Sequence, residues 1–264
     1  MLIFVVKRMK VDFSWPKSYR CAFSLTFDDG LTSQLRIAVP LLNEFGLRGT
    51  FYLNPRGEWR RNLAPWREVF KSGHEIGNHS LSHLCSCNYS GKPDSRGLEN
   101  ISLRDIEEDL VEAQRRLSEV FPEQKNWTFA YPCYQEFVGY GEKRKSYVPI
   151  VAQYFIAARG VGVSRRLANS PLACDLHYLW SWPVEGTSGA EMIGYVMRAY
   201  AQGRWGILTF HGINEGHLSV SDVDFRELLD FLGSNSDRIW VAPVIEVAEY
   251  IREWRLRHGV GFKG

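Results

Sequence analysis

The chain has 264 residues, of which 45% are hydrophobic and 14% aromatic, and its 32 Lys and Arg against 30 Asp and Glu leave a formal net charge of +2. This composition supports a large core, and the near-balanced charge gives no reason to expect a nucleic acid or a membrane surface as partner. No stretch is long enough to span a membrane. The length allows one large domain or two small ones. Because no repeat or linker interrupts the chain, we expect a single domain over 1–264 with a core at about 21–250.

The cysteines indicate a reducing environment. They are Cys21, Cys85, Cys87, Cys133 and Cys174. An odd number at irregular spacing does not resemble a disulfide framework, and reduced thiols in a cytosolic protein are the simpler interpretation. The N-terminus, MLIFVVKRMK, has a short apolar run and no cleavage-site pattern, so it is not typical of a signal peptide. We expect a cytoplasmic protein, or a secreted one if a leader has been removed.

Strand-like and helical segments alternate along the chain. Apolar, β-favouring runs predict strands at 21–27, 49–54, 74–78, 127–131, 154–159, 177–183, 205–210 and 238–242. Helical spacing predicts helices at 33–45, 102–120, 188–203, 225–232 and 245–254, with Pro40 kinking the first or delaying its start. We expect loops at 84–101 and 132–147. The alternation indicates parallel βαβ units, and this length fits a distorted (β/α) barrel of about seven to eight parallel strands better than an open sheet.

The first strand ends in an unusual pair of acids, within the sequence SLTFDDG at 24–30. Two adjacent carboxylates at the end of a buried strand cost desolvation and mutual repulsion unless a cation receives them. Because neighbours on an extended chain point in opposite directions, Asp28 and Asp29 can have different roles. For this motif alone, a helix cap followed by a turn at Gly30 is the simpler explanation.

Other polar residues also follow predicted strands. The carboxyl ends of parallel strands form the active-site rim of α/β proteins. The residues at these ends are Asp28, Asp29, Asn78, His79, Pro132, Cys133, Arg159, Trp182 and His211, with His83 four residues beyond His79. Random placement would send some of these residues to the opposite ends. Their convergence therefore indicates a site.

His79 and His83 have the H-x-x-x-H spacing, which places two imidazoles on one face of a helical turn. The spacing alone is weak, because such pairs are often surface neighbours. One carboxylate from a neighbouring strand would complete a two-histidine, one-aspartate set with an open position for water, as in catalytic zinc sites. The same set suits non-haem Fe(II). We expect a divalent metal, with Zn²⁺ as the first choice.

These residues resemble the polysaccharide deacetylases of the NodB-homology type, carbohydrate esterase family 4. The resemblance rests on TFDDG at 26–30, HSLSH at 79–83, AYPCY at 130–134 and ILTFHG at 207–212, and it covers 21–247. It implies a distorted (β/α) barrel of about seven strands. It also implies metal-assisted hydrolysis of an N- or O-linked acetyl group from a carbohydrate.

The resemblance assigns roles to individual residues. The implied metal ligands are Asp29, His79 and His83. Asp28 would be the general base and His211 the general acid for the leaving group. The backbone N–H of Cys133 would stabilise the oxyanion.

The chain departs from the family pattern in the third motif. The family has an arginine that orients the catalytic aspartate, where this chain has Ala130. We expect Arg159, at the end of the next strand, to supply that cation; the alternative is an ordinary surface ion pair. The residues expected to contact substrate are Trp182, Leu208, Pro132 and Tyr134. Trp182 and Leu208 would wall an acetyl-sized pocket, although both would also fit a core.

Several alternatives stay open. The same scaffold could hydrolyse a small non-polymeric amide, or the protein could be a non-catalytic sugar-binding relative. A Cys133 nucleophile paired with His211, or a thiolate metal site at Cys85 and Cys87, would leave the paired acids unexplained. An Fe(II) oxygenase would require a different fold. We expect His74 to make structural hydrogen bonds, and the remaining histidines, His177, His217 and His258, to be surface or packing residues.

Overall fold

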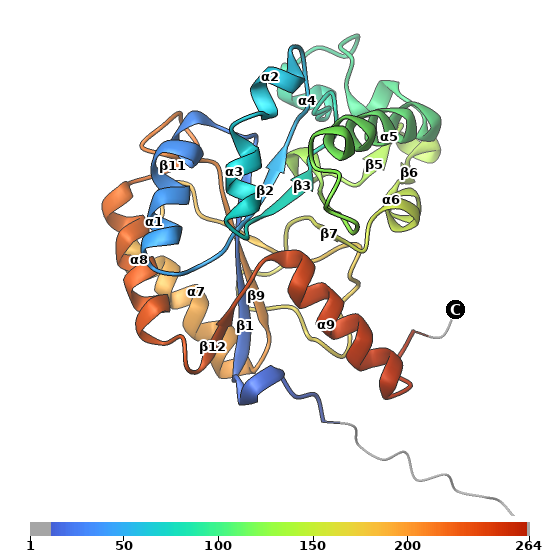
Figure 1. Ribbon diagram of the computed structural model, residues 1–264. Helices are drawn as coiled ribbons and strands as arrows, with labels where there is room; N and C mark the ends of the chain where they lie inside the picture. Colours follow the sequence, from blue (N-terminus) through green and yellow to red (C-terminus); the bar gives the residue numbers. More distant parts are fainter. Residues whose placement is uncertain (1–11, 263–264) are drawn as a thin grey trace, which may run out of the picture.

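The computed structural model describes residues 12–262. Its centre is a curled sheet of parallel strands with helices packed around the outside (Figure 1). Residues 1–11, in which we expected no signal peptide, lie outside the described residues, as do 263–264. Between residues 12 and 262, no helix combines the length and the apolar character needed to cross a membrane.

Eight strands form the main sheet. They are β1 (Cys21–Asp28), β2 (Thr50–Leu53), β3 (Glu75–Asn78), β4 (Thr128–Ala130), β7 (Ala157–Arg159), β8 (Trp182–Pro183), β9 (Trp205–Phe210) and β12 (Ile239–Val241). Their order is β7-β4-β3-β2-β1-β9-β8, β12 pairs with the first half of β1, and every pair is parallel. All eight predicted strands are therefore confirmed, with shorter bounds at most of them.

The curled sheet closes into a distorted barrel through one short segment. Leu179 forms a parallel bridge with Arg159 at the end of β7. Three residues later, Trp182 pairs with Leu208 of β9. The segment 179–183 thus spans the gap between the two edges of the sheet. The predicted distorted (β/α) barrel is confirmed.

The helices lie outside this sheet (Figure 1). They are α1 (Val39–Glu44), α2 (Trp59–Leu63), α3 (Trp66–Lys71), α4 (Cys87–Ser90), α5 (Leu103–Val120), α6 (Val148–Tyr154), α7 (Gly189–Gln202), α8 (Asp222–Ser234) and α9 (Val244–Arg257). Helices α5, α7, α8 and α9 were predicted, and α5 begins at the expected capping box of Ser102 and Asp105. A π-helical turn at Gln34–Ala38 runs directly into α1 through helical backbone at Ala38 and Val39, so Pro40 lies inside a continuous helical segment and the expected late start is not observed.

The segments expected to be loops contain short elements. Helix α4 and a 3₁₀ turn at Leu98–Asn100 interrupt 84–101. An antiparallel pair of β5 (Phe137–Val138) and β6 (Lys145–Ser146) interrupts 132–147. After β9, the two-residue strands β10 (Gly212–Ile213) and β11 (Ser219–Val220) pair with each other. Elements this short carry too few residues for a periodic pattern.

The two faces of β1 differ in polarity, and this difference determines where the site lies. Every residue of β1 is buried. Phe23 and Phe27 belong to the core that packs under the helices, where Phe27 meets Phe225 of α8 at a ring distance of 5.9 Å. Ser24 lies on the other face, where it accepts a hydrogen bond from the indole of Trp205. Since alternate residues share a face, Asp28 lies on the same inner, polar face as Ser24.

Candidate active site at the carboxyl ends of the strands

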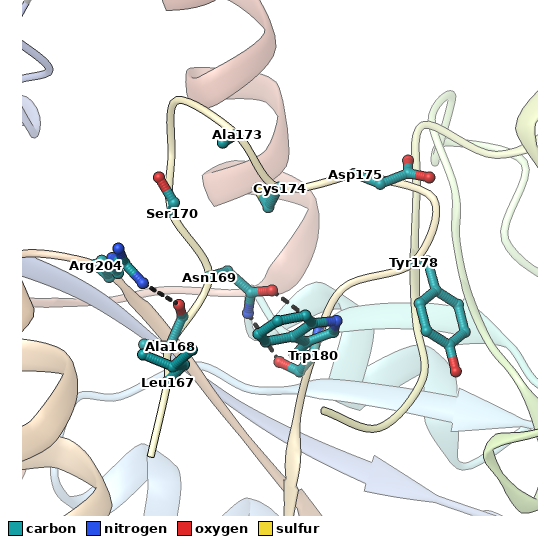
Figure 2. Close-up of a pocket in the computed structure, with 10 residues that line it drawn as sticks. All are labelled: Leu167, Ala168, Asn169, Ser170, Ala173, Cys174, Asp175, Tyr178, Trp180 and Arg204. Atoms are coloured by element: carbon teal, nitrogen blue, oxygen red, sulfur yellow. Dashed lines mark hydrogen bonds between the residues drawn. The ribbon is translucent and has the colours of Figure 1, made fainter. Parts of the chain in front are cut away.

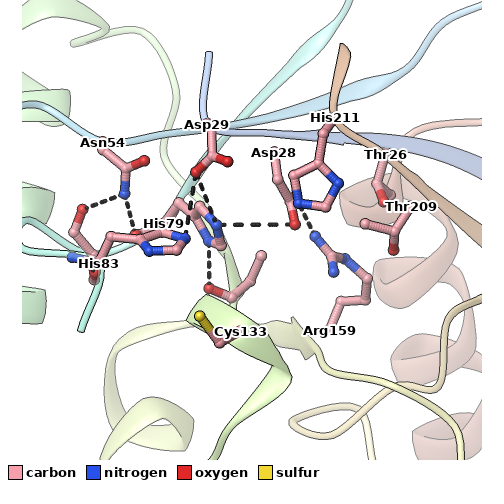
Figure 3. A network of polar contacts seen from close by, with 12 residues as sticks. Thr26, Asp28, Asp29, Asn54, His79, His83, Cys133, Arg159, Thr209 and His211 are labelled. Carbon is pink, nitrogen blue, oxygen red and sulfur yellow. Dashed lines mark hydrogen bonds and ion pairs between the residues drawn. The ribbon is translucent and has the colours of Figure 1, made fainter. Parts of the chain in front are cut away.

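The turn after β1 separates the two adjacent acids. Asp28 is the last residue of β1 and is 2% exposed, whereas Asp29 and Gly30 both adopt left-handed backbone conformations, with φ of 73° and 65°. Glycine tolerates this conformation without strain, and aspartate is among the few other residues that do. The turn therefore leaves Asp28 on the barrel interior and places the half-buried Asp29 at its rim (Figure 3).

Asp28 forms a buried ion pair with Arg159. The Nη2 of Arg159 donates to Oδ1 of Asp28, and the arginine is fully buried at the end of β7. Ala130 and Arg159 are direct partners in the β4–β7 register. The guanidinium therefore enters the site from the strand beside the position where the family has its arginine. The alternative of a surface ion pair is wrong for Arg159.

The pKa of Asp28 reflects this neighbourhood. Burial alone raises the pKa of a carboxyl group. The charge of Arg159, with smaller contributions from His79 and His211, outweighs burial and holds the pKa of Asp28 below its ordinary value.

Arg159 lies 5.1 Å from the ring centre of Tyr52, an added cation–π contact. Among residues 12–262, its Nε and Nη1 have no hydrogen-bond partner.

His79 and His83 lie on a loop after β3 and not on the helical turn we expected. Ser80 and His83 have positive φ angles of 63° and 50°, which a helix excludes. The loop is held by side chains: Ser80 Oγ accepts from the His83 N–H, and Asp109 of α5 accepts from the N–H groups of Leu81 and Ser82. The two imidazoles meet with ring centres 4.8 Å apart.

The backbone fixes which nitrogen of His79 faces the acids. Its Nδ1 lies 2.8 Å from the carbonyl oxygen of Ala130. Because a carbonyl only accepts hydrogen bonds, Nδ1 carries the proton and Nε2 keeps its lone pair. Burial lowers the pKa of His79 to about 4, against the opposing charge of Asp28. The residue is therefore a neutral imidazole, the form that binds metals.

Asp29, His79 and His83 together fit a divalent cation. The Nε2 atoms of His79 and His83 lie 3.6 Å and 3.4 Å from Oδ1 of Asp29. One potential ligand atom from each of the three residues lies within 4.8 Å of the other two. Two imidazoles and one carboxylate are a donor set that zinc and other divalent metals accept. The Nδ1–carbonyl bond of His79 is the support that metal-ligating histidines commonly have.

His211 directly follows β9 and lies beside Asp28 and Arg159 in Figure 3. Gln34 donates from Nε2 to the carbonyl oxygens of both Asp28 and His211, which fixes the ends of β1 and β9 together. The Nδ1 of His211 is buried and, within the described chain, has no hydrogen-bond partner. The polar residues that meet at this rim are Asp28, Asp29, His79, His83, Arg159 and His211. Asn78, also predicted at a strand end, instead donates from its amide to Leu110 and Gln114 of α5.

The turn after β4 differs from expectation at Cys133. Cys133 and Cys85 form a disulfide. The expectation that all cysteines are reduced is therefore wrong for these two, and the sulfur of Cys133 is not free to act as a nucleophile. The turn's own hydrogen bonds are donated by the N–H groups of Tyr134 and Gln135, so that they do not use the N–H of Cys133. That N–H stays a predicted oxyanion donor.

The residues predicted to contact substrate are divided between rim and core. Trp182 is 3% exposed and stacks on Tyr195 of α7 at 5.0 Å, and Leu208 is fully buried. Both belong to the helix-covered core, which favours their packing role over the pocket wall. Pro132 is buried in the turn, whereas Tyr134 is partly exposed, 5.9 Å from the guanidinium carbon of Arg159.

The sequence analysis missed three supporting residues, Gln34, Asn54 and Asp109. The amide of Asn54 donates to the carbonyl oxygens of His79 and Ser80. Asn54 directly follows β2, so the rule used for the other strand ends could have identified it. Gln34 and Asp109 lie on helices, and nothing in their spacing marks them. His74 accepts from the N–H of Gly49, which confirms its structural role.

A separate cavity of about 370 Å³ lies at the other end of the barrel and shares no residue with the acids and histidines (Figure 2). Its Asn169 pairs with Trp205, the first residue of β9, whereas His211 follows the last. Asn169 is fully used by Trp180 and Trp205. The convergent acids, histidines and arginine therefore mark the carboxyl end as the candidate active site.

Fold and site together define a (β/α)-barrel protein with a two-histidine, one-carboxylate centre at the carboxyl ends of its strands. Residues 19–140 match the family model described as polysaccharide deacetylase. Over this part, a little under half of its length, the chain is similar to the polysaccharide deacetylase family, in agreement with the motifs.

Two curated proteins and a number of solved structures are similar to this chain. Gellan lyase of a Bacillus species is 23% identical over 92% of this chain, which spans 10% of that protein, and the chain spans 30% of a second curated relative from Bacillus subtilis. A protein assigned as a polysaccharide deacetylase from Mycobacterium smegmatis has a similar structure (TM-score 0.66, 18% identity, 92% and 94% of the two chains).

Two further structures with the same fold differ in activity. A family 4 acetyl xylan esterase from Clostridium thermocellum in complex with a cobalt ion matches with a TM-score of 0.55 at 18% identity, over 91% of this chain and 93% of that one. A CE4 family pseudoenzyme from Bacillus anthracis matches with a TM-score of 0.53 at 16% identity, over 86% and 65%. Structural similarity at this identity shows the fold alone.

Proposed function

We propose that this protein is a metal-dependent hydrolase that removes N- or O-linked acetyl groups from a carbohydrate. The observation that carries the proposal is the convergence of Asp28, Asp29, His79, His83 and His211 on one rim. A polar cluster of this kind costs desolvation. A site that had lost its chemistry would have no need for all five of these residues.

Asp28 acts as the general base in this proposal. Arg159 holds its carboxylate from one side, and the Nε2 of His79 lies 3.9 Å from its other oxygen. The carboxylate is therefore fixed in orientation before substrate binds, which reduces the reorganisation needed during reaction. It accepts the proton of the attacking water.

His211 acts as the general acid from the end of the neighbouring strand β9. It protonates the departing amine or alcohol. The N–H of Cys133 donates to the carbonyl oxygen of the acetyl group as negative charge develops there.

Asp29, His79 and His83 would hold the divalent cation, for which Zn²⁺ is the first candidate and the cobalt-bound relative a precedent. When bound, the cation supplies Lewis-acid chemistry that polarises the acetyl carbonyl and lowers the pKa of water. Asp29 supplies the negative charge and the imidazoles the neutral nitrogens that this ligand set needs.

The disulfide bears on where the protein works. Disulfides persist in oxidising compartments and are rare in the cytosol. Cys85 and Cys133 therefore favour an oxidising compartment over the cytoplasmic location that we expected from the sequence. An external location also suits a polymeric carbohydrate substrate better than a small cytosolic amide.

The test pairs metal content with acetate release. Native protein and the Asp29→Ala and His79→Ala variants are offered acetylated chitooligosaccharides and acetylated xylan. We expect about one divalent cation per native chain and joint loss of cation and acetate release in both variants. Asp230→Ala and His258→Ala, which change the same residue types away from the site, should keep both.

Other outcomes separate the alternatives. Cation binding without acetate from any glycan would favour hydrolysis of a small amide, and screening acylated amides would then follow. Sugar binding without any turnover would identify a non-catalytic relative. Absence of a bound cation in correctly folded native protein would contradict the site itself.

A further inference from the structure

The disulfide joins two segments that both carry active-site groups. Cys85 comes two residues after His83, and Cys133 comes three residues after Ala130, whose carbonyl fixes His79. The Cα atoms of the two cysteines are 5.7 Å apart, although 48 positions separate them in sequence. The sulfur of Cys85 lies 3.8 Å from Nδ1 of His83, and Cys133 lies near the two histidines in Figure 3.

The two ring nitrogens of His83 face different groups. Nε2 lies 3.4 Å from Asp29, on the side of the proposed catalytic cation. Nδ1 lies 3.8 Å from the sulfur of Cys85. One potential ligand atom each from His83, Cys85 and Cys133 lies within 4.8 Å of the other two. A second set of three ligands thus exists beside the first, and His83 belongs to both.

We propose that reduction of the disulfide creates a second metal site, formed by Cys85, Cys133 and Nδ1 of His83, that takes a thiophilic cation such as Zn²⁺, Cd²⁺ or Cu⁺. A dithiol supplies two electrons and two protons: the S–S bond breaks, two S–H groups form, and the dithiol becomes a disulfide. Binding of the cation then releases both thiol protons to water. This second site rests on the proposed function only in that His83 is also a ligand of the proposed catalytic cation.

The positions of the two cysteines suit this change. Two sulfurs bound to one tetrahedral Zn²⁺ at about 2.3 Å each lie about 3.8 Å apart. Cysteines with Cα atoms 5.7 Å apart reach that separation by rotation about their Cα–Cβ bonds. Two thiolates and one imidazole leave a fourth position for water, as in catalytic zinc sites of the Cys₂His type.

Because His83 belongs to both ligand sets, a cation in the second site affects metal binding at the first. Soft cations bind to thiolates more strongly than to carboxylates. A neutral imidazole has one lone pair, so a cation held by Cys85, Cys133 and Nδ1 of His83 competes for His83 with the cation that Asp29 and His79 would hold. In the disulfide form the sulfurs have no such affinity, and His83 serves the Asp29 site alone.

The experiment uses Cd²⁺ alone as the probe. The full chain is reduced with a phosphine, which becomes the phosphine oxide by taking oxygen from water, and is then desalted without oxygen. Cadmium is titrated while the ultraviolet thiolate-to-cadmium charge-transfer band is recorded. We expect the band in reduced protein with one equivalent of cadmium, and no band in the disulfide form.

Variants assign the band to its ligands. Cys85→Ser and Cys133→Ser should each weaken cadmium binding by at least tenfold, whereas Cys87→Ser, two residues from Cys85, should leave the titration unchanged. Far-ultraviolet circular dichroism checks that each variant is folded. A reduced protein without the band, or a band that persists in the double Cys85→Ser, Cys133→Ser variant, would overturn the proposal.

One further variant keeps this test separate from the proposed function. Asp29→Ala removes a ligand of the catalytic site and none of the second site. Reduced Asp29→Ala protein should therefore keep the cadmium band even though it releases no acetate. Loss of the band in this folded variant would refute an independent thiolate site, whatever the outcome of the deacetylase assay.

Discussion

At the scale of single residues, Arg159 stands out because its charged side chain is fully buried. A buried arginine next to an aspartate is costly unless the two are paired, and here the pair joins the ends of β1 and β7. Ala130 is the partner of Arg159 in the β4–β7 register. The cation beside Asp28 therefore comes from β7, the strand next to β4.

Replacing Arg159 by methionine should therefore destabilise the protein. The uncharged side chain leaves the Asp28 carboxylate buried without a partner, which typically costs about 3–5 kcal/mol of the free energy of unfolding. Urea denaturation measures this loss. The double Asp28→Asn, Arg159→Met variant should lose at least about 1 kcal/mol less than the sum of the single variants, because no unpaired charge remains.

The exposed Arg198→Met on α7 is the matched control and should change stability by less than about 0.5 kcal/mol. Additive single effects would show that Asp28 and Arg159 are energetically independent. Acetate release by Arg159→Lys should exceed that of Arg159→Met, because lysine restores the charge without the planar geometry of arginine.

At the scale of elements, the histidine loop depends on α5. The Asp109 carboxylate, 8% exposed, accepts from the N–H of Leu81 at 2.7 Å and from that of Ser82 at 3.0 Å. These bonds satisfy backbone groups that no helix or strand satisfies. The loop therefore takes its shape from a side chain 28 positions away, and this shape brings His79 and His83 together.

Asp109→Ala should weaken metal binding without unfolding α5. Supporting groups of this kind typically contribute 10–100-fold to metal affinity, and we expect a loss in that range, measured by isothermal titration with Zn²⁺. Glu108→Ala, an exposed neighbour on the same helix, should leave the affinity unchanged. Equal affinities for the two variants would mean that the loop holds its shape without Asp109.

At the scale of the whole molecule, a buried carboxyl group connects the barrel to the last helix. Glu75 of β3 accepts hydrogen bonds from Thr50, Thr128 and the N–H of Ile245 at the start of α9. Burial raises the pKa of Glu75 to about 7, although these hydrogen bonds oppose the shift. Strands β2, β3 and β4 and helix α9 thus meet at one titrating group.

The sign of the resulting pH dependence follows from the raised pKa. The folded state binds a proton at Glu75 more tightly than the unfolded state, in which Glu75 has its ordinary pKa of 4.5. The stabilising contribution is complete below about pH 4.5, falls between pH 4.5 and 7, and is lost above pH 7. Relative to wild type, Glu75→Gln should therefore gain up to about 3 kcal/mol of unfolding free energy as the pH rises through this window.

Urea denaturation of both proteins at several pH values measures the difference. Glu253→Gln, on the exposed face of α9, is the control and should follow wild type at every pH. A constant difference between wild type and Glu75→Gln across the window would contradict a raised pKa at Glu75.

The sequence alone determined the strands, the main helices, the barrel and the rim on which the polar residues meet, because these follow from periodicity and from the common direction of parallel strands. It also identified each residue of the Asp29, His79 and His83 set. Tertiary structure decided what depends on contacts between distant segments. The register of β4 and β7 placed Arg159 on Asp28, α5 shaped a loop where spacing suggested a helix, and the approach of two loops joined Cys85 to Cys133. No local pattern records such contacts, because they arise only when the barrel closes.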